Sequence, residues 1–311
     1  MSKFLVTGGA GFIGSHIVER LVKDKHYVRI LDNFSSGKML NLKAIESKVD
    51  LIKADICSKA VCLKATKNID FVLHQAALRS VPKSMHEPHE YNRVNIDGTL
   101  NMLEAAKKNK VKRFVFASSS SVYGEVDVFP EKETFIPSPI SPYALSKLTA
   151  EHYCKIFSLH FGLPTIVLRY FNVFGPRQSL DDEYAVVIPK FINCLLNNQQ
   201  PPIFGNGKQS RDFTYVQNVV EANLLAARSK KINFCIFNIA NGKDTTVLDL
   251  VHILNKILGK DIKALFLAKR KGDVFKTLAD IGLSRKLLKF RPVVDFITGL
   301  KTTAGYWGEL A

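Results

Sequence analysis

The chain has 311 residues, of which 46% are hydrophobic and 10% aromatic, a composition typical of a globular protein and not of a disordered one. Its 44 lysines and arginines exceed its 28 acidic residues, which gives a net charge of +16. This charge favours an anionic partner, such as a phosphorylated small molecule, a nucleic acid or an acidic membrane surface. No apolar run approaches the ~18 residues that span a membrane, and glycines from Gly8 onwards interrupt any signal-peptide core. We therefore expect a cytoplasmic protein.

Five scattered cysteines form no Cys-x-x-Cys pair, and His and Cys do not fall at metal-ligand spacing. We expect reduced thiols and no metal site. The lysines and arginines are dispersed, and we find no RNA-binding aromatic motif, zinc finger or helix-turn-helix pattern. We therefore expect a solvated basic surface and no nucleic-acid partner.

The first half of the chain alternates between short apolar strands and helices. This pattern predicts an α/β fold with a doubly wound parallel sheet that has helices on both faces. The helices are expected at residues 15–24, between residues 55 and 69, at residues 95–110 and from 143 onwards. The strands are expected at residues 3–6, 26–32, 49–55, 69–77, 112–118 and 164–175.

The rhythm changes near residue 176, where a polar loop precedes an expected helix at residues 186–198. Residues 208–227 and 235–241 return to the alternating pattern, and residues 246–258 predict an amphipathic helix. Because no long linker separates these parts, we expect a smaller second domain that is interleaved with the first.

Gly8, Gly11 and Gly14 form a G-x-x-G-x-x-G turn between the first strand and the first helix. Glycines let the backbone approach a pyrophosphate, and a helix N-terminus offers free N–H groups to it. Asp32 ends the next strand, 18 residues after Gly14, near the spacing of a ribose-binding acid. An acid there repels a 2′-phosphate, so the pattern predicts NAD and not NADP.

Tyr143 and Lys147 lie four residues apart in SPYALSK, on one face of a predicted helix. A nearby ammonium favours the phenolate form of a tyrosine, so the pair suits proton transfer. On spacing alone, an exposed surface pair is the main alternative. The serine run at residues 118–121 follows a predicted strand, and strand C-termini gather ligands in such a sheet.

Together, TGGAGFIG, Asp32, Ala54–Asp55, HQAA, SSSSVYG, YALSK and RYFNVFGPRQ resemble the extended short-chain dehydrogenase/reductase family, and within it the nucleotide-sugar 4-epimerases. The resemblance implies that Tyr143 and Lys147 are catalytic. It implies that Ser119 shares the substrate oxygen with Tyr143 and that Ser118 faces the cofactor, while Ser120 and Ser121 stay open as alternatives for the acting serine. Tyr143 would take the proton of the sugar 4-hydroxyl while NAD takes the C4 hydride.

The resemblance also implies the binding residues. Those for NAD are Gly8, Gly11, Phe12, Ile13, Gly14, Asp32, Asn33, Asp55, Ile56, Gln75, Ala76, Ala77, Ser118, Tyr143, Lys147 and Tyr170. Those for a UDP-sugar are Ser80, Val81, Ser119, Ser120, Tyr143, Asn172, Val187, Ile188, Phe204, Gly205, Arg211, Arg270, Asp273 and Thr277. It predicts an NAD-binding domain at residues 1–170 and about 213–243. A nucleotide-sugar domain would hold about 171–212 and 244–311.

Specificity is expected to depend on Thr277, at a position that resembles a size-limiting site. A small residue there leaves room for a 2-acetamido group, so we predict UDP-GlcNAc and UDP-GalNAc as substrates, with UDP-glucose and UDP-galactose also open. Arg79 stands where the resemblance leads us to expect a small residue. An arginine there could bind a carboxylate, so UDP-glucuronate 4-epimerase or decarboxylase stays open as an alternative. A 4,6-dehydratase would need an acidic pair where Ser120 and Ser121 stand. A non-catalytic redox-sensing or nucleic-acid-binding protein is supported only by the charge.

The resemblance further implies a homodimer that is formed through residues near 95–110 and 143–160.

Overall fold

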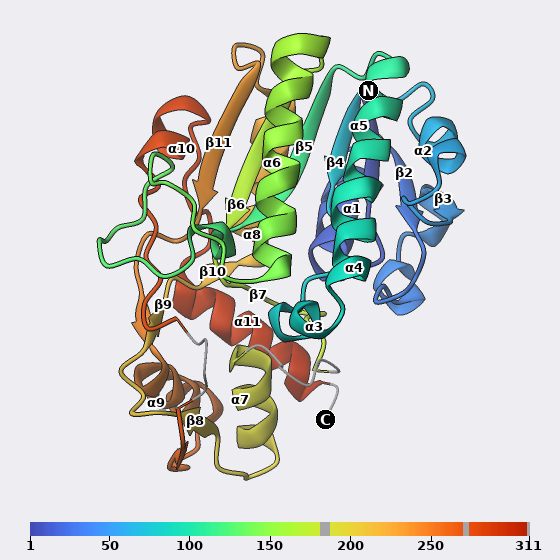
Figure 1. Ribbon diagram of the computed structural model, residues 1–311. Helices are drawn as coiled ribbons and strands as arrows, with labels where there is room; N and C mark the ends of the chain where they lie inside the picture. The colour runs from blue at the N-terminus through green and yellow to red at the C-terminus, as the bar shows by residue number, and fades with distance from the viewer. Residues whose placement is uncertain (181–186, 270–273, 310–311) are drawn as a thin grey trace.

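A computed structural model describes residues 1–180, 187–269 and 274–309 of the chain (Figure 1). Its centre is a seven-stranded, fully parallel sheet in the order β11-β6-β5-β4-β1-β2-β3. The strands are β1 (Lys3–Thr7), β2 (Tyr27–Asp32), β3 (Asp50–Lys53), β4 (Phe71–His74), β5 (Arg113–Ser119), β6 (Thr165–Tyr170) and β11 (Phe234–Ile239). The predicted doubly wound α/β fold is therefore confirmed.

Both faces of the sheet are covered, which explains why the strands are continuous apolar runs. Phe4 and Val6 of β1 pack in one core and Leu5 packs in the other, because side chains alternate along a strand. On the first face lie α1 (Phe12–Lys23) and α8 (Val216–Arg228). On the second face lie α2 (Lys59–Ala65), α5 (Gly98–Lys108) and α6 (Pro142–Phe161).

The helix expected at residues 95–110 is longer and less regular than its apolar pattern suggests. α3 (Val81–His86) and α4 (Pro88–Tyr91) lead into a π-helical segment, η3 (Asn92–Asp97), before α5 begins. Asn95 is buried here, and its amide donates to the Leu78 carbonyl and to Ser146 on α6. The wider π turn therefore aims a polar side chain at the inner face of α6.

A second core lies beside the carboxyl edge of the sheet, in the lower part of Figure 1. Its helices are α7 (Val187–Leu196), α9 (Val247–Leu258) and α11 (Phe296–Gly308). Three short strand pairs adjoin them: β7 (Val173–Phe174) with β10 (Thr214–Tyr215), β8 (Pro202–Phe204) with β13 (Leu265–Leu267), and β9 (Ser210–Arg211) with β12 (Thr245–Thr246). α10 (Gly282–Leu287) returns to the side of β11. Short 3-10 turns complete the chain: η1 (Met39–Leu42), η2 (Glu46–Lys48) and η4 (Ser120–Tyr123).

The chain enters this second core after β6, returns to the sheet with α8 and β11, and leaves it again at α9. This path supports the interleaved division at residues 1–170 and about 213–243 against 171–212 and 244–311, which we retain as a proposal. Among the residues that the structure describes, no helix is both long and apolar enough to cross a membrane.

Two buried carboxyl groups lie where the second core meets the sheet. Glu131 is 2% exposed, and its backbone bridges Leu278 and Asp280. Asp212 is fully buried and accepts hydrogen bonds from the backbone N–H groups of Asn241, Gly242 and Ala279. Burial raises the pKa of each to about 7, against the effect of the backbone N–H donors. The fold therefore favours the protonated form of both groups at mildly acidic pH.

A carboxyl whose pKa is raised by folding stabilises the protein below its unfolded pKa, and this contribution is lost as pH rises through the folded value. We therefore predict that Glu131→Gln stabilises the protein at pH 8 by about 1–2 kcal/mol, with a much smaller effect at pH 5. Urea unfolding at both pH values measures the difference. Exposed Glu125→Gln in the same loop is the control, and an equal effect of Glu131→Gln at both pH values would contradict the prediction.

Candidate active site

The glycine turn between β1 and α1 is closed too tightly for side chains. Gly8 has a φ of +66°, and a Cβ there would lie 2.8 Å from the Ala76 nitrogen. A Cβ on Gly14 would collide with the Gly8 carbonyl oxygen. The N-cap residue of α1 is Gly11, which has no side chain to accept a hydrogen bond, so the first N–H groups of the helix point to the end of the turn without a capping side chain from that position. This turn fits a pyrophosphate at the helix N-terminus.

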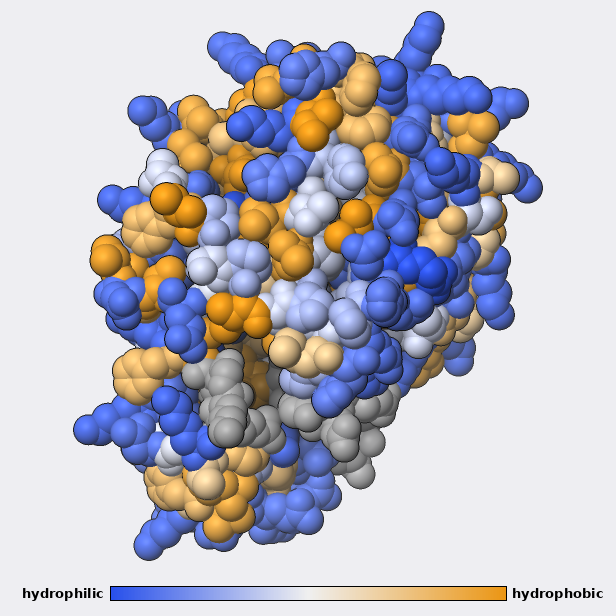
Figure 2. Space-filling model, viewed as in Figure 1, coloured by the Kyte–Doolittle hydropathy of each residue, from blue (hydrophilic) through white to orange (hydrophobic). Residues whose placement is uncertain are grey.

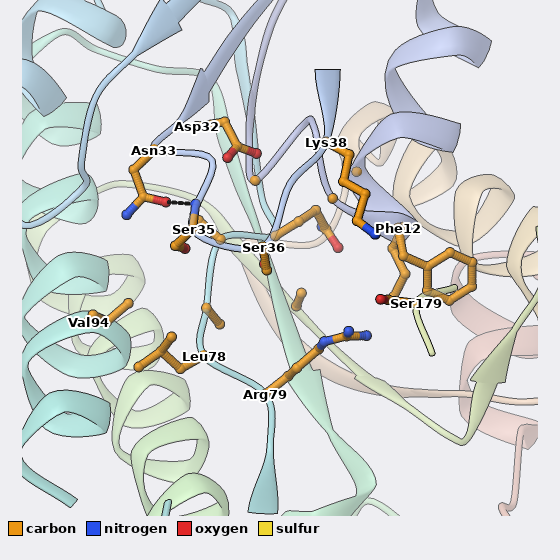
Figure 3. A pocket seen from close by; sticks show the side chains of 18 of the residues that line it. Phe12, Asp32, Asn33, Ser35, Ser36, Lys38, Leu78, Arg79, Val94 and Ser179 are labelled. Atoms are coloured by element: carbon orange, nitrogen blue, oxygen red, sulfur yellow. Dashed lines mark hydrogen bonds between the residues drawn. The ribbon is translucent and has the colours of Figure 1, made fainter. Parts of the chain in front are cut away.

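Asp32 stands at the end of β2, next to the turn, and is 7% exposed. Its carboxylate accepts hydrogen bonds from the Ala10 and Phe34 backbone N–H groups at 2.9 and 2.8 Å. Burial raises its pKa, and these two donors oppose that effect. Figure 3 shows Asp32, Asn33 and Ser35 near one another at the upper left of the cavity lining, with Phe12 to the right and Arg79 below. A carboxylate in this place suits a ribose hydroxyl.

The first cavity has a volume of about 490 Å³ and opens along the carboxyl edge of the sheet. It is lined by every residue that the sequence predicts for NAD: Gly8, Gly11, Phe12, Ile13, Gly14, Asp32, Asn33, Asp55, Ile56, Gln75, Ala76, Ala77, Ser118, Tyr143, Lys147 and Tyr170. The uncapped helix, the glycine cradle and the acid after β2 thus lie in one elongated space. The residues present fit a dinucleotide, and their individual binding roles stay predictions.

Tyr143 and Lys147 are held by the start of α6. The Ser141 hydroxyl caps this helix by accepting from the Ala144 N–H at 3.2 Å, and Pro142 occupies its first turn. Tyr143 and Lys147 are 9% and 5% exposed, so they are not an exposed surface pair. The Lys147 Nζ donates to the Ala117 carbonyl at 2.9 Å and lies 5.1 Å from the centre of the Phe116 ring.

The pKa values of this pair are shifted in opposite directions by the same cause. Burial lowers the pKa of Lys147 to about 8, and the Glu151 carboxylate opposes this shift. Burial raises the pKa of Tyr143, while a hydrogen bond with Ser119 and the charge of Arg79 lower it. In a closed site, an added positive charge beside the phenol would act in the same direction as Ser119 and Arg79 and would favour the phenolate form of Tyr143.

The serine run follows the end of β5 and divides its side chains between two cavities. Ser118 lines the first cavity, and its hydroxyl donates to Glu151. Ser120 and Ser121 line a second cavity of about 500 Å³. Ser119 lies between them, hydrogen-bonded to Tyr143 and, through its hydroxyl, to Ser121 at 3.1 Å. Ser119 itself lines neither cavity, but its hydrogen bonds connect Tyr143 in the first cavity with Ser121 in the second.

The second cavity brings together much of the predicted substrate set, namely Val81, Ser120, Asn172, Val187, Ile188, Phe204, Arg211 and Thr277. Ser80 instead caps α3, by accepting a hydrogen bond from the Lys83 N–H. Gly205 adjoins Phe204 but is not part of the cavity lining. Arg270 and Asp273 lie outside the described residues.

Thr277 is tied into the wall of the second cavity. Its hydroxyl oxygen accepts hydrogen bonds from the Asn172 side-chain amide at 2.8 Å and from the Asp212 N–H at 3.3 Å. The Arg211 Nη1 donates to the carbonyls of Ser210 and Phe275 at 2.9 and 3.2 Å. Thr277 is thus a small side chain that hydrogen bonds hold in a fixed position in the wall of the second cavity.

Several lining residues were not predicted from the sequence. Lys38, Arg93 and Arg177 line the first cavity, as do Tyr306 and Trp307 from α11. Glu131 and Lys190 line the second cavity, and Gln178 lines both. Lys38 follows Asp32 closely in sequence, and this nearness could have predicted it as a lining residue. α11 is some 300 residues from the glycine turn in sequence, and only tertiary packing brings the two together. Within the described residues, no three His, Cys, Asp or Glu side chains are grouped to hold a metal ion.

Comparison with known proteins agrees with this geometry. A family model described as "NAD dependent epimerase/dehydratase family" matches residues 4–240. UDP-N-acetylglucosamine 4-epimerase from Methanobrevibacter ruminantium M1, solved with UDP-N-acetylmuramic acid, is 44% identical, with a TM-score of 0.95 and coverage of 100% of this chain and 99% of that one. UDP-glucose 4-epimerase from Thermotoga maritima, solved with UDP-glucose, is 40% identical, with a TM-score of 0.94 and coverage of 99% of both chains.

A third solved relative carries both a cofactor and an acidic sugar. A variant of UDP-glucuronic acid 4-epimerase from Bacillus cereus, in complex with NAD and a fluorinated UDP-glucuronic acid, is 34% identical, with a TM-score of 0.92 and coverage of 99% of this chain and 100% of that one. On its family model, its fold and these relatives, the chain belongs with the UDP-sugar 4-epimerases of the NAD-dependent epimerase/dehydratase family.

Proposed function

We propose that this enzyme inverts C4 of UDP-GlcNAc and UDP-GalNAc, and that it also accepts UDP-glucose and UDP-galactose. The observation that carries the proposal is the run of hydrogen bonds from Tyr143 through Ser119 to Ser121, which connects the lining of the first cavity with that of the second. One cavity fits a dinucleotide, and the other is large enough for a nucleotide-sugar. A sugar at their junction would present its 4-hydroxyl to the phenol.

The chain's own groups would move and hold the proton of that hydroxyl. Tyr143, as phenolate, accepts the proton, and the Ser119 hydroxyl hydrogen-bonds to the same sugar oxygen. Lys147, as ammonium, stabilises the phenolate form of Tyr143. NAD, when bound, supplies reversible hydride chemistry at C4 of the sugar. Tyr143 then returns the proton to the oxygen at C4, and the second cavity must let the sugar present its other face.

The remaining predicted residues have the roles that their resemblance to the family's motifs implies. Gly8, Gly11 and Gly14 would hold the pyrophosphate of NAD and Asp32 its ribose. Arg211, with Arg270 outside the described residues, would bind the substrate diphosphate, since a guanidinium pairs with phosphate oxygens. Asn172 would contact the same group, while Val187, Ile188 and Phe204 would form the nucleobase side of the second cavity.

The preference for N-acetylated sugars rests on Thr277. A small residue in this fixed wall leaves space that a large aromatic ring would fill. The solved relative with UDP-N-acetylmuramic acid supports an N-acetylated substrate class.

A second candidate is UDP-glucuronate, as substrate of an epimerase or decarboxylase. Arg79 lines the first cavity, and its charge lowers the pKa of Tyr143. A guanidinium within electrostatic reach of the reacting oxygen suits a sugar that carries a carboxylate. The Bacillus cereus relative supports this class.

We also propose that the enzyme is a cytoplasmic homodimer, joined through α5 and α6. Leu145, Ile156 and Leu159 on the outer face of α6 are 53%, 42% and 60% exposed, and Figure 2 shows apolar side chains scattered over this face. A second copy would cover them. A monomeric mass by light scattering at micromolar concentration would contradict the dimer.

Tyr143→Phe removes only the phenolic oxygen, so we predict that it lowers the rate of C4 inversion of UDP-GlcNAc by at least ~100-fold without unfolding the protein. Proton NMR of the anomeric signals measures turnover with UDP-GlcNAc, UDP-glucose and UDP-glucuronate in parallel. Tyr153→Phe is the matched control, because Tyr153 lies on the same helix and lines neither cavity. Retention of the wild-type rate by Tyr143→Phe would exclude the proposed role. Turnover of UDP-glucuronate alone would favour the second candidate.

Thr277→Tyr places a ring where we propose that the 2-acetamido group lies. We predict a fall of about 10- to 100-fold in kcat/KM for UDP-GlcNAc, with UDP-glucose changed much less. Thr277→Val separates size from hydrogen bonding, because it keeps the volume and loses the contacts with Asn172 and Asp212. Equal losses for both sugars in Thr277→Tyr would show that Thr277 does not set the size limit.

A further inference from the structure

A buried ion pair lies one helical turn beyond the catalytic pair on α6. Glu151 on α6 and Arg169 on β6 are each 2% exposed. The Arg169 guanidinium donates to both carboxylate oxygens, from Nε at 2.9 Å and from Nη2 at 2.6 Å. The Ser118 hydroxyl, from β5, donates to the first of these oxygens. Glu151 thus joins α6 to the last residues of two strands.

The helix that positions the catalytic residues, α6, also positions the carboxylate of this ion pair. Tyr143, Lys147 and Glu151 follow one another at intervals of four, so they share one face of α6. Ser118 and Arg169 are direct neighbours in the register of β5 and β6. The rest of the guanidinium faces the Tyr123 ring, with its carbon 4.6 Å from the ring centre, and its Nη1 has no hydrogen-bond partner among the described residues.

The ion pair also sets the electrostatic surroundings of Lys147. Burial opposes the ammonium form of Lys147, and among charged side chains Glu151 is the main one that favours it. From β4, His74 approaches Lys147, but burial lowers the pKa of His74 to about 3, so it is neutral. From β6 comes Arg169, whose charge is compensated by Glu151. On α6 itself, Tyr143 and the Cys154 thiol complete the titratable groups, and burial keeps both neutral in this structure.

We infer that Glu151 is a positioning residue whose carboxylate, held by Arg169 and Ser118, keeps Lys147 in its ammonium form and thereby sets the alkaline limit of catalysis. The inference rests on the proposed function, in which the ammonium stabilises the Tyr143 phenolate. Without the carboxylate, Lys147 would lose its proton at a lower pH. The phenol would then revert to its neutral form in the range where the enzyme works.

A purely structural role for the pair makes a different prediction. Replacing a buried ion pair with apolar residues of similar volume is often neutral for stability, whereas removing one partner is strongly destabilising. If the pair only packs α6 against the sheet, a folded variant without it would keep the wild-type dependence of kcat on pH. If it holds the charge of Lys147, the alkaline limb of kcat moves even in a variant that folds normally.

The experiment compares the pH dependence of kcat for the wild type with three variants. Glu151→Gln leaves Arg169 unpaired, and we expect the alkaline limb to move to lower pH by about one unit or more. Arg169→Gln leaves the carboxylate unpaired, and we expect the limb to move to higher pH. The double variant Glu151→Leu/Arg169→Met, which is expected to keep stability, should move it to lower pH by less than Glu151→Gln.

One further readout and one control variant separate cofactor binding from catalysis. Trp307 is the only tryptophan in the chain and lines the first cavity, so its fluorescence reports NAD binding to each variant. Glu221→Gln, which breaks the half-exposed pair with Arg20, is the control and should leave the pH dependence unchanged.

An alkaline limb at the wild-type pH in any folded variant of the three would overturn the inference, and one folded variant is enough to decide. If the alkaline limb moved in the same direction in Glu151→Gln and in Arg169→Gln, the inference would also be overturned. The first variant leaves a positive charge unpaired and the second a negative charge, so the two shifts must be opposite. An inactive wild type would instead count against the proposed function.

Discussion

The Lys147 ammonium donates to the Ala117 carbonyl at 2.9 Å in a place that is almost closed to water, and this contact fixes where the catalytic helix must lie. An ammonium loses hydration when it is buried, so it needs a full set of partners. The carbonyl at the end of β5, the Phe116 ring and the Glu151 carboxylate supply them. With Lys147 held there, Tyr143 one turn earlier must lie at the carboxyl edge of the sheet, where it lines the first cavity.

The parallel sheet explains why two binding sites converge at this residue. Strand ends in a doubly wound sheet gather at one edge, and the order of the strands reverses between β1 and β4. β1 and β2 contribute the glycine turn and Asp32 to the first cavity. β5 passes its serine run from the first cavity to the second, and the segments after β6 build the far wall of the second cavity. The chemistry is therefore placed at the boundary between the two cores.

Much of this arrangement follows from local sequence. The alternation of apolar runs and helices predicts the parallel sheet, and Gly8, Asp32, Tyr143 and Lys147 each stand at a strand end or a helix start that the sequence marks. What local sequence does not contain is the tertiary surroundings. The hydroxyl of Ser118 turns to Glu151, Ser80 caps a helix, and Thr277 accepts a hydrogen bond from Asn172 across 105 positions of sequence. Trp307 reaches the first cavity through the packing of α11, and the buried pair of Glu151 and Arg169 is visible only once β6 and α6 are placed together.

The central claim is that Tyr143 works as a phenolate. Burial alone raises the pKa of Tyr143, so the claim requires that the Lys147 ammonium and the positive charge of bound NAD+ lower this pKa far below that of an ordinary tyrosine. The direct measurement is an ultraviolet difference titration of tyrosinate, wild type against Tyr143→Phe, with the enzyme saturated with NAD+. We expect one tyrosine to ionise well below the ordinary tyrosine pKa of ~10, and we expect this early ionisation to be lost in Lys147→Met. If the wild type and Tyr143→Phe titrate alike until pH ~10, Tyr143 is an ordinary buried phenol and its proposed role as the catalytic base is wrong.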